Sequence, residues 1–148
     1  MGFNKVILSQ ELTQNQINFL SDTGIKREAI VYGNTCVMTS EYCPIGCIAG
    51  GFCAGKKCSM PCLKNDKYFL RDRMNMEFRI ISDNIDCQSQ LFNSKICSIE
   101  SNNLNVDSIR LDIIDDNAIE VQNSINTHKA GRKLSGEKYT TGHVNRPV

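Results

Sequence analysis

The alternation of apolar and polar positions predicts short strands separated by helices in the first third of the chain. Residues 5–9 form an apolar run, and residues 28–33 form another that is closed by glycine. Both runs are typical of short buried strands. Between them, apolar residues recur at helical spacing, which predicts an amphipathic helix over residues 11–24 that ends at a glycine. A glycine-rich stretch without periodicity follows, and we expect it to be a loop.

The same reading predicts further strands and one long helix in the remainder of the chain. The expected elements are a hairpin over residues 67–83 with its turn at 74–76, a strand over 95–101, a helical turn over 102–108, a strand over 108–114, a helix over 115–131 and a loop-like tail over 132–148. The long helix begins with acidic residues and ends with lysine and glycine, as the helix macrodipole favours.

Strands that alternate with helices predict a single α/β domain built on a parallel sheet. A complete eightfold barrel takes about 250 residues, whereas this chain has 148. The pattern therefore leaves two architectures open, a smaller open α/β sheet or the C-terminal part of a larger barrel. In either architecture the hairpin and the glycine-rich loop are insertions.

Composition and charge narrow the function classes. The chain is 41% hydrophobic and 22% charged, with a formal net charge of +1, so it has material for a core and no global basic field for nucleic acid. Any site for a polyanion must be local. No apolar stretch is long enough to span a membrane, and the opening residues do not resemble a signal peptide. We therefore expect a cytoplasmic protein without a membrane partner.

Sulfur is concentrated in one part of the chain, since five of the eight cysteines lie between residues 41 and 62. In a reducing compartment, clustered cysteines are more typical of metal sites than of disulfides, so we expect no disulfide. Four thiolates held by flexible, glycine-rich backbone suit a [4Fe–4S] cluster. Four thiolates also suit zinc, but zinc sites usually pair cysteines as CxxC, which is absent here. Both metals remain open, and the spacing favours the cluster.

Several motifs together resemble the collagenase-like U32 peptidase family. They are "VYGNTCVMTSEYCPIG", "GKKCSMPC", "YFLRDRMNMEF", "DNIDC", "RLD" and "YTTGHVNR", and they occur in the family's order across essentially the whole chain. The resemblance implies a partial TIM-like (β/α) barrel, with residues 1–148 as its C-terminal half and residues 34–87 as a cysteine-rich insertion. It also implies that the missing N-terminal half-barrel, or a second copy of the chain, completes the core.

The family name implies proteolysis, but the sequence has no HExxH motif, no GxSxG motif and no obvious Cys/His pair. Relatives in the family are implicated in oxygen-independent hydroxylation of RNA bases or quinone precursors, and they hold an iron–sulfur cluster. The resemblance implies a fragment of such a hydroxylase, acting on RNA or a small aromatic substrate. A peptidase and a truncated remnant that only binds metal are the alternatives.

The resemblance also implies which cysteines hold the cluster. The expected ligands are Cys43, Cys58, Cys62 and Cys87, with Cys36 in reserve. Of the remaining cysteines, Cys47 and Cys53 look like additions, and Cys97, in an apolar strand, is expected to be a small buried hydrophobe.

Four other residues are candidates for binding or catalysis. Arg73, in the hairpin, offers a guanidinium to an anionic substrate, and an exposed ion pair is the structural alternative. Arg110 and Asp112 are two apart on one strand and so face the same side, which in a barrel is the active-site side; a buried structural pair is the alternative. The resemblance adds His143. The other histidine, His128, lies on a helix that we expect at the surface.

Overall fold

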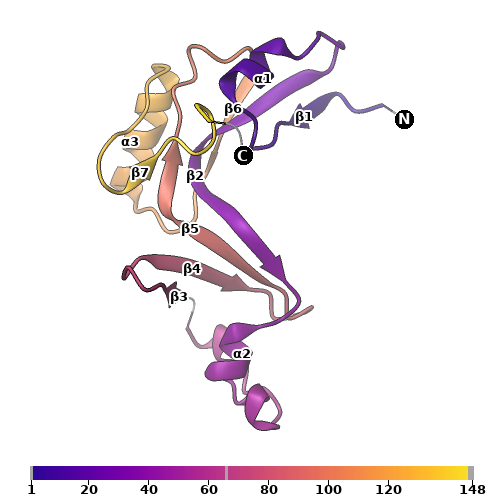
Figure 1. Cartoon of the computed structure of the whole chain (residues 1–148), viewed down its shortest axis with the longest axis vertical. Coiled ribbons are helices and arrows are strands. Elements are labelled where there is room, and N and C mark those ends of the chain that lie inside the picture. Colours follow the sequence, from indigo (N-terminus) through magenta and orange to yellow (C-terminus); the bar gives the residue numbers. More distant parts are fainter. Residues whose placement is uncertain (1, 66, 147–148) are drawn as a thin grey trace. The chain divides into compact units, whose positions relative to one another are not determined.

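The computed structural model describes residues 2–65 and 67–146. The chain forms two compact units (Figure 1). The first, here called the terminal unit, contains residues up to 35 and residues from 95 onward; the second, the central unit, contains residues 36–94. Two long strands, β2 (Lys26–Ser40) and β5 (Ser89–Ser98), belong to both units.

The terminal unit is built on parallel strands, as the sequence predicts. β1 (Lys5–Ile7) pairs in parallel with β2, and β2 pairs in parallel with β6 (Ser108–Asp112). β5 pairs in parallel with the short strand β7 (Tyr139–Thr140). Buried apolar side chains from these strands and from the following segments form the core, namely Ala29, Val31, Cys97, Ile99 and Val144.

Two capped helices belong to the terminal unit. α1 (Gln14–Phe19) begins at a capping box in which Gln16 N–H donates to Thr13 Oγ1 at 3.2 Å and Thr13 N–H donates to Gln16 Oε1 at 2.8 Å. This box places the helix start three residues later than predicted, because it satisfies the first free backbone N–H groups there. α3 (Ala118–Lys129) begins at an equivalent box on Asn117.

The central unit contains the predicted hairpin and the cysteine-rich segment. β3 (Tyr68–Arg71) and β4 (Glu77–Ser82) form an antiparallel hairpin, and β4 pairs antiparallel with β5. The cysteine-rich segment folds into a short helix, α2 (Pro44–Ile48), and two 3-10 turns, η1 (Phe52–Ala54) and η2 (Pro61–Leu63). α2 contacts both turns.

The sheet differs from the predicted parallel half-barrel. It has seven strands, is mixed because the hairpin adds antiparallel strands, and is not closed into a barrel within the described residues. β2 also continues to Ser40 instead of ending at Gly33. Gly33 is a point of close approach, since a Cβ there would collide with the carbonyl oxygen of Asp112 on β6, and the strand continues past it.

Four local predictions were wrong. β5 spans residues 89–98 rather than 95–101, residues 102–107 form turns and irregular backbone rather than helix, and the tail contains β7. β1 was expected to be buried but is exposed at all three of its positions. The expectation of no disulfide was also wrong, because Cys47 and Cys53 are joined. Each difference depends on a residue far along the chain or on a bond between side chains. The hydrophobic pattern of a single segment carries no information about either.

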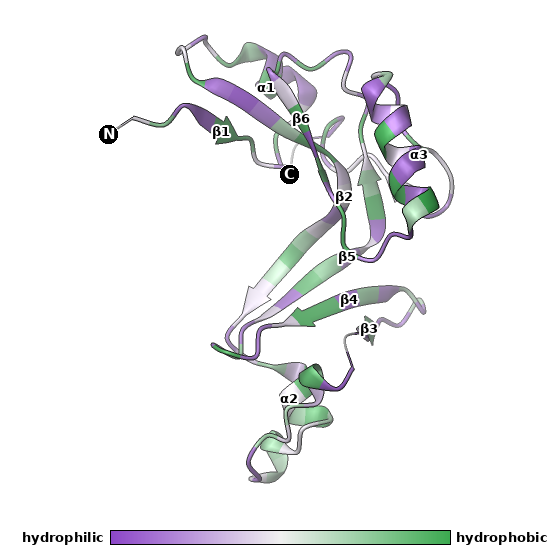
Figure 2. Ribbon diagram, turned by 180° about the vertical axis from the view of Figure 1, so that it is seen from behind, coloured by the Kyte–Doolittle hydropathy of each residue, from purple (hydrophilic) through white to green (hydrophobic). Residues whose placement is uncertain are grey.

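α3 has only a weak separation of apolar and polar faces. Figure 2 shows hydrophilic and hydrophobic residues interspersed along it, and its buried residues are Ser124 and His128 rather than aliphatic side chains. The prediction that His128 lies at the surface was therefore wrong. No helix within residues 2–65 and 67–146 has both the length and the apolarity that crossing a membrane requires.

Candidate functional site

Four cysteines line one pocket of the central unit. The pocket has a volume of about 360 Å³, and its sulfur comes from Cys43, Cys58, Cys62 and Cys87. These are the four cysteines that the family resemblance singles out, and they arrive from separate segments: the start of α2, the segment before η2, η2 itself and the loop between β4 and β5. The other lining residues are Glu41, Tyr42, Gly46, Phe52, Lys56, Lys57, Met60, Asp83 and Asn84.

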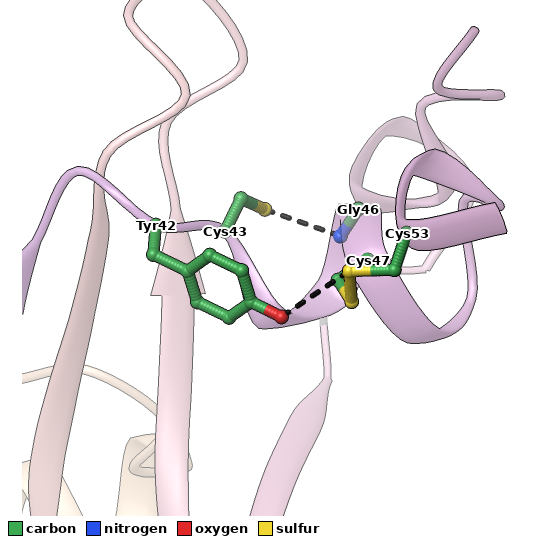
Figure 3. The surroundings of a disulfide bond; sticks show 5 residues. All are labelled: Tyr42, Cys43, Gly46, Cys47 and Cys53. Carbon is green, nitrogen blue, oxygen red and sulfur yellow. Dashed lines mark hydrogen bonds between the residues drawn. A yellow bond between two sulfur atoms is a disulfide. The ribbon is translucent and has the colours of Figure 1, made fainter. Parts of the chain in front are cut away.

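Cys43 is held at the N-terminus of α2 by hydrogen bonds to its sulfur. The backbone N–H of Gly46 donates to Cys43 Sγ at 3.2 Å (Figure 3). Ser82 Oγ lies 3.6 Å from the same sulfur and 2.7 Å from Ser89 Oγ. Burial opposes ionisation of the thiol, but the Gly46 N–H, which donates to the sulfur, and the nearby hydroxyls of Ser82 and Ser89 outweigh it and lower the pKa of Cys43. A lowered pKa favours the thiolate, which is the form that binds metal.

Two glycines make room for the Cys58 sulfur. A Cβ on Gly46 would stand 3.3 Å from Cys58 Sγ and 3.4 Å from Cys43 Sγ. A Cβ on Gly50 would stand only 2.7 Å from Cys58 Sγ. Real Cβ atoms are not found that close to sulfur, so a larger residue at position 50 would displace the thiol. The glycines of this segment therefore bring two thiols to one side of the pocket.

Cys87 is presented by a tight turn between β4 and β5. The Asp83 carboxylate accepts hydrogen bonds from the backbone N–H of Ile85 at 3.0 Å and of Asp86 at 2.8 Å. These bonds lower the pKa of Asp83 and fix the turn. Cys87 follows with φ of +56°, and Met60, between the two cysteines of the η2 region, has φ of +49°. Left-handed backbone at residues other than glycine is costly and is typical of functional sites.

The pocket combines thiols with a mostly apolar lining. Across the described residues, no three His, Cys, Asp or Glu side chains are placed to hold one metal ion together. The four cysteines line the same pocket as Tyr42, Phe52 and Met60. Thiolates are ligands for iron–sulfur clusters and also for zinc.

The other cysteines lie elsewhere. Cys36, the reserve ligand, is exposed on β2, where its thiol donates to Met38 O at 3.5 Å, and it is not among the described residues that line the pocket. Cys97 is 2% exposed in the core of the terminal unit, as expected for a small hydrophobe. Burial raises its thiol pKa to about 11.

The four catalytic candidates are not among the described residues that line this pocket. Arg73 is exposed in the turn between β3 and β4. In the terminal unit, Arg110 Nε donates to Asp112 Oδ1 at 2.5 Å, and both side chains are partly exposed. The two residues therefore share a face and pair with each other. His143 is exposed in the tail.

Sequence reasoning missed the polar groups that support the site. Ser82 and Ser89 approach Cys43 only because β4 and β5 pair with these two residues opposite each other. No local signal marks either serine. The lysines at 56 and 57 were visible in the sequence, but their place on the pocket wall depends on the fold of residues 44–63.

Comparison with known proteins assigns the chain to a family. Residues 1–130 match the model of peptidase family U32. No curated protein and no solved structure matches the chain. Because the match covers well over half of the sequence and includes all four pocket cysteines, the chain belongs to peptidase family U32.

Proposed function

We propose that the chain holds a [4Fe–4S] cluster on Cys43, Cys58, Cys62 and Cys87. The observation that carries this proposal is that these four thiols line one pocket of about 360 Å³. The cluster belongs to an enzyme of the U32 family that hydroxylates an RNA base or a small aromatic substrate without oxygen gas, and this chain is a part of that enzyme.

The spacing of the cysteines supports the cluster over zinc, because structural zinc sites usually pair cysteines as CxxC and this sequence has no CxxC. The lowered pKa of Cys43 and the placement of Cys43 and Cys58 on either side of Gly46 favour binding of a thiolate-ligated group, either a cluster or zinc. When bound, the cluster supplies one-electron redox chemistry, which a zinc ion cannot.

The pocket wall also suits an anionic aromatic substrate. Lys56 and Lys57 provide positive charge, and Tyr42 and Phe52 provide aromatic surface on which a base or ring can stack. Asp83 and Glu41 add negative charge to the same wall, but the Asp83 carboxylate is already engaged by backbone N–H groups of its own turn. The positive charge of Lys56 and Lys57 therefore favours a substrate that carries phosphate or carboxylate.

The peptidase alternative finds no support in the one Ser–His contact that the described residues show. His128 Nε2 lies 3.2 Å from Ser98 Oγ, which is the distance a nucleophile and its base require. However, both side chains are 1% exposed, and Ser98 Oγ accepts a hydrogen bond from Leu134 N–H at 2.8 Å. The pair is packed inside the terminal unit and is structural.

Anaerobic reconstitution with iron and sulfide tests the cluster. The wild-type chain should gain four irons per chain, as a [4Fe–4S] cluster requires, with broad visible charge-transfer absorption. Cys62→Ser should lose most of this iron, whereas Cys36→Ser and Cys97→Ser should retain it. Equal iron loss in all three variants would overturn the ligand assignment. Zinc bound in preference to the cluster, with tetrahedral sulfur coordination by X-ray absorption, would favour the zinc alternative.

The substrate class is tested separately. RNA from cells that express the chain would be digested and searched by mass spectrometry for hydroxylated nucleosides, with the Cys62→Ser variant as control. A cluster without any hydroxylated product would favour the truncated remnant. Peptide cleavage that persists after metal removal would favour the peptidase.

A further inference from the structure

The disulfide between Cys47 and Cys53 joins the two elements that form one wall of the pocket. Cys47 lies in α2, next to Gly46, and Cys53 lies in η1 (Figure 3). We propose that this bond is a reversible thiol–disulfide exchange site, and that its oxidation state controls how firmly the pocket holds the Cys58 thiol. The part of the proposal that concerns metal rests on the proposed function.

The bond is accessible to small thiols from one side. Cys53 is exposed, whereas Cys47 is half-buried. Tyr42 Oη lies 3.4 Å from Cys53 Sγ, and since a disulfide sulfur carries no hydrogen, the tyrosine hydroxyl is the donor. The same hydroxyl can stabilise a Cys53 thiolate after reduction. Tyr42 also lines the pocket, so one side chain lies at both the disulfide and the pocket.

The exchange needs only a small-molecule thiol such as glutathione. Its thiolate attacks Cys53 Sγ and forms a mixed disulfide, while the Cys47–Cys53 bond breaks and Cys47 leaves as a thiolate that takes a proton from water. A second glutathione thiolate attacks the glutathione sulfur of the mixed disulfide and releases Cys53. Two electrons pass from two glutathione molecules, which leave as oxidised glutathione, and the reverse sequence reoxidises the pair.

The coupling to the pocket follows from the contacts of Cys58. Its sulfur packs against Gly46 and Gly50, which lie before and after Cys47 in the chain. The disulfide closes a short loop, with six positions separating its cysteines, and this loop contains Gly50. Breaking the bond returns conformational freedom to that loop. The wall behind Cys58 then loses its fixed position relative to Cys43, and the pocket becomes less preorganised for its ligand.

The exchange itself is tested by equilibrating the metal-free chain in glutathione buffers of graded potential, blocking thiols, and counting blocked cysteines by peptide mass spectrometry. We expect Cys47 and Cys53 to change together in one two-electron step within the range of the buffers. Their failure to change together, or reduction only under denaturing conditions, would overturn the proposal.

The coupling is tested by the rate at which a maleimide alkylates Cys58. Loss of the disulfide should raise this rate roughly tenfold, because the short loop regains its freedom, while the rate at Cys36 stays unchanged. The reduced wild type and the double variant Cys47→Ser/Cys53→Ser should behave alike, so a folding defect of the variant alone cannot produce the result. An equal Cys58 rate in the oxidised and reduced wild type would overturn the coupling.

Cobalt binding separates this proposal from the proposed function. Co²⁺ gives thiolate-to-metal absorption, and we expect it to bind roughly tenfold more weakly to the reduced chain and to the double variant than to the oxidised chain. If Co²⁺ and reconstituted iron bind neither form but the Cys58 rate still follows the disulfide, the proposed function fails and the exchange site stands. If metal binds equally to both forms, the coupling fails and the metal site stands.

Discussion

The sulfur of Cys58 packs against the backbone of Gly50 so closely that a Cβ at position 50 would stand 2.7 Å from it. We therefore expect Gly50→Ala to push the thiol out of its place, at a cost of about 1–3 kcal/mol in the free energy of unfolding. The same change should reduce iron retention after reconstitution. Chemical denaturation and iron analysis would measure the two effects.

Gly55→Ala provides the contrast, because a Cβ there meets nothing within 4 Å although φ is +71°. It should cost about 1 kcal/mol through backbone strain and leave iron retention unchanged. Equal iron loss in the two glycine variants would show that the contact with Cys58 is not what makes Gly50 necessary.

The hydrogen bonds to Cys43 predict an unusually reactive thiol. Its pKa is lowered by Gly46, Ser82 and Ser89 against the opposing effect of burial, so alkylation of Cys43 should begin at lower pH than that of an ordinary cysteine. Ser82→Ala removes one of these groups and should shift the pH–rate profile of Cys43 upward. Peptide-resolved iodoacetamide kinetics would measure it. If the pH–rate profile of Cys43 is the same in Ser82→Ala as in the wild type, the serine does not stabilise the thiolate.

We expect the folded chain to lose stability in acid when Glu28 becomes protonated. Hydrogen bonds from Lys5 Nζ at 2.7 Å and Ser108 Oγ at 3.0 Å lower the pKa of its carboxyl below the ordinary 4.5. A lowered folded-state pKa means that the stabilisation is present above pH 4.5 and is lost as the pH falls through the folded-state value. Denaturation at graded pH should show this loss in the wild type and a flatter acid limb in Glu28→Gln. Glu137→Gln, at an exposed position, should keep the wild-type profile.

The exposed edge of β1 leads us to expect that the chain associates with another strand. In the described sheet β1 pairs only with β2, and Val6 and Ile7 are each 45% exposed. They line an apolar pocket of about 650 Å³ together with Phe3, Leu20 and Ile25. We propose that a second copy, or a partner strand, covers this edge, because unpaired strand edges with apolar side chains pair readily.

The unfolding temperature should then rise with protein concentration, by mass action, and Val6→Lys should remove that dependence. Size-exclusion chromatography and thermal unfolding at several concentrations would measure it. A monomer whose unfolding temperature is independent of concentration would contradict the prediction.

The sequence by itself indicated the three parallel strands β1, β2 and β6, the long helix α3 and the family of the chain. Apolar runs at residues 5–9, 28–33 and 108–114 predicted strands, and strands lie within or across these runs and pair in parallel. Burial explains the run in β2, whereas β1 is exposed at all three of its positions. The motifs around the cysteines placed the chain in the U32 family over residues 1–130. Short-range pattern suffices for these features, since each depends on neighbours in the chain.

Tertiary structure alone decided what surrounds those thiols. Cys87 reaches the pocket because β4 and β5 pair antiparallel and end in the turn fixed by Asp83, and Ser82 faces Ser89 through the same register. The burial of His128 against Ser98 likewise requires α3 to pack on β5. Each of these contacts joins residues whose approach is set by hydrogen bonding between separate strands or by packing between separate elements, and the periodicity of a single segment carries no information about it.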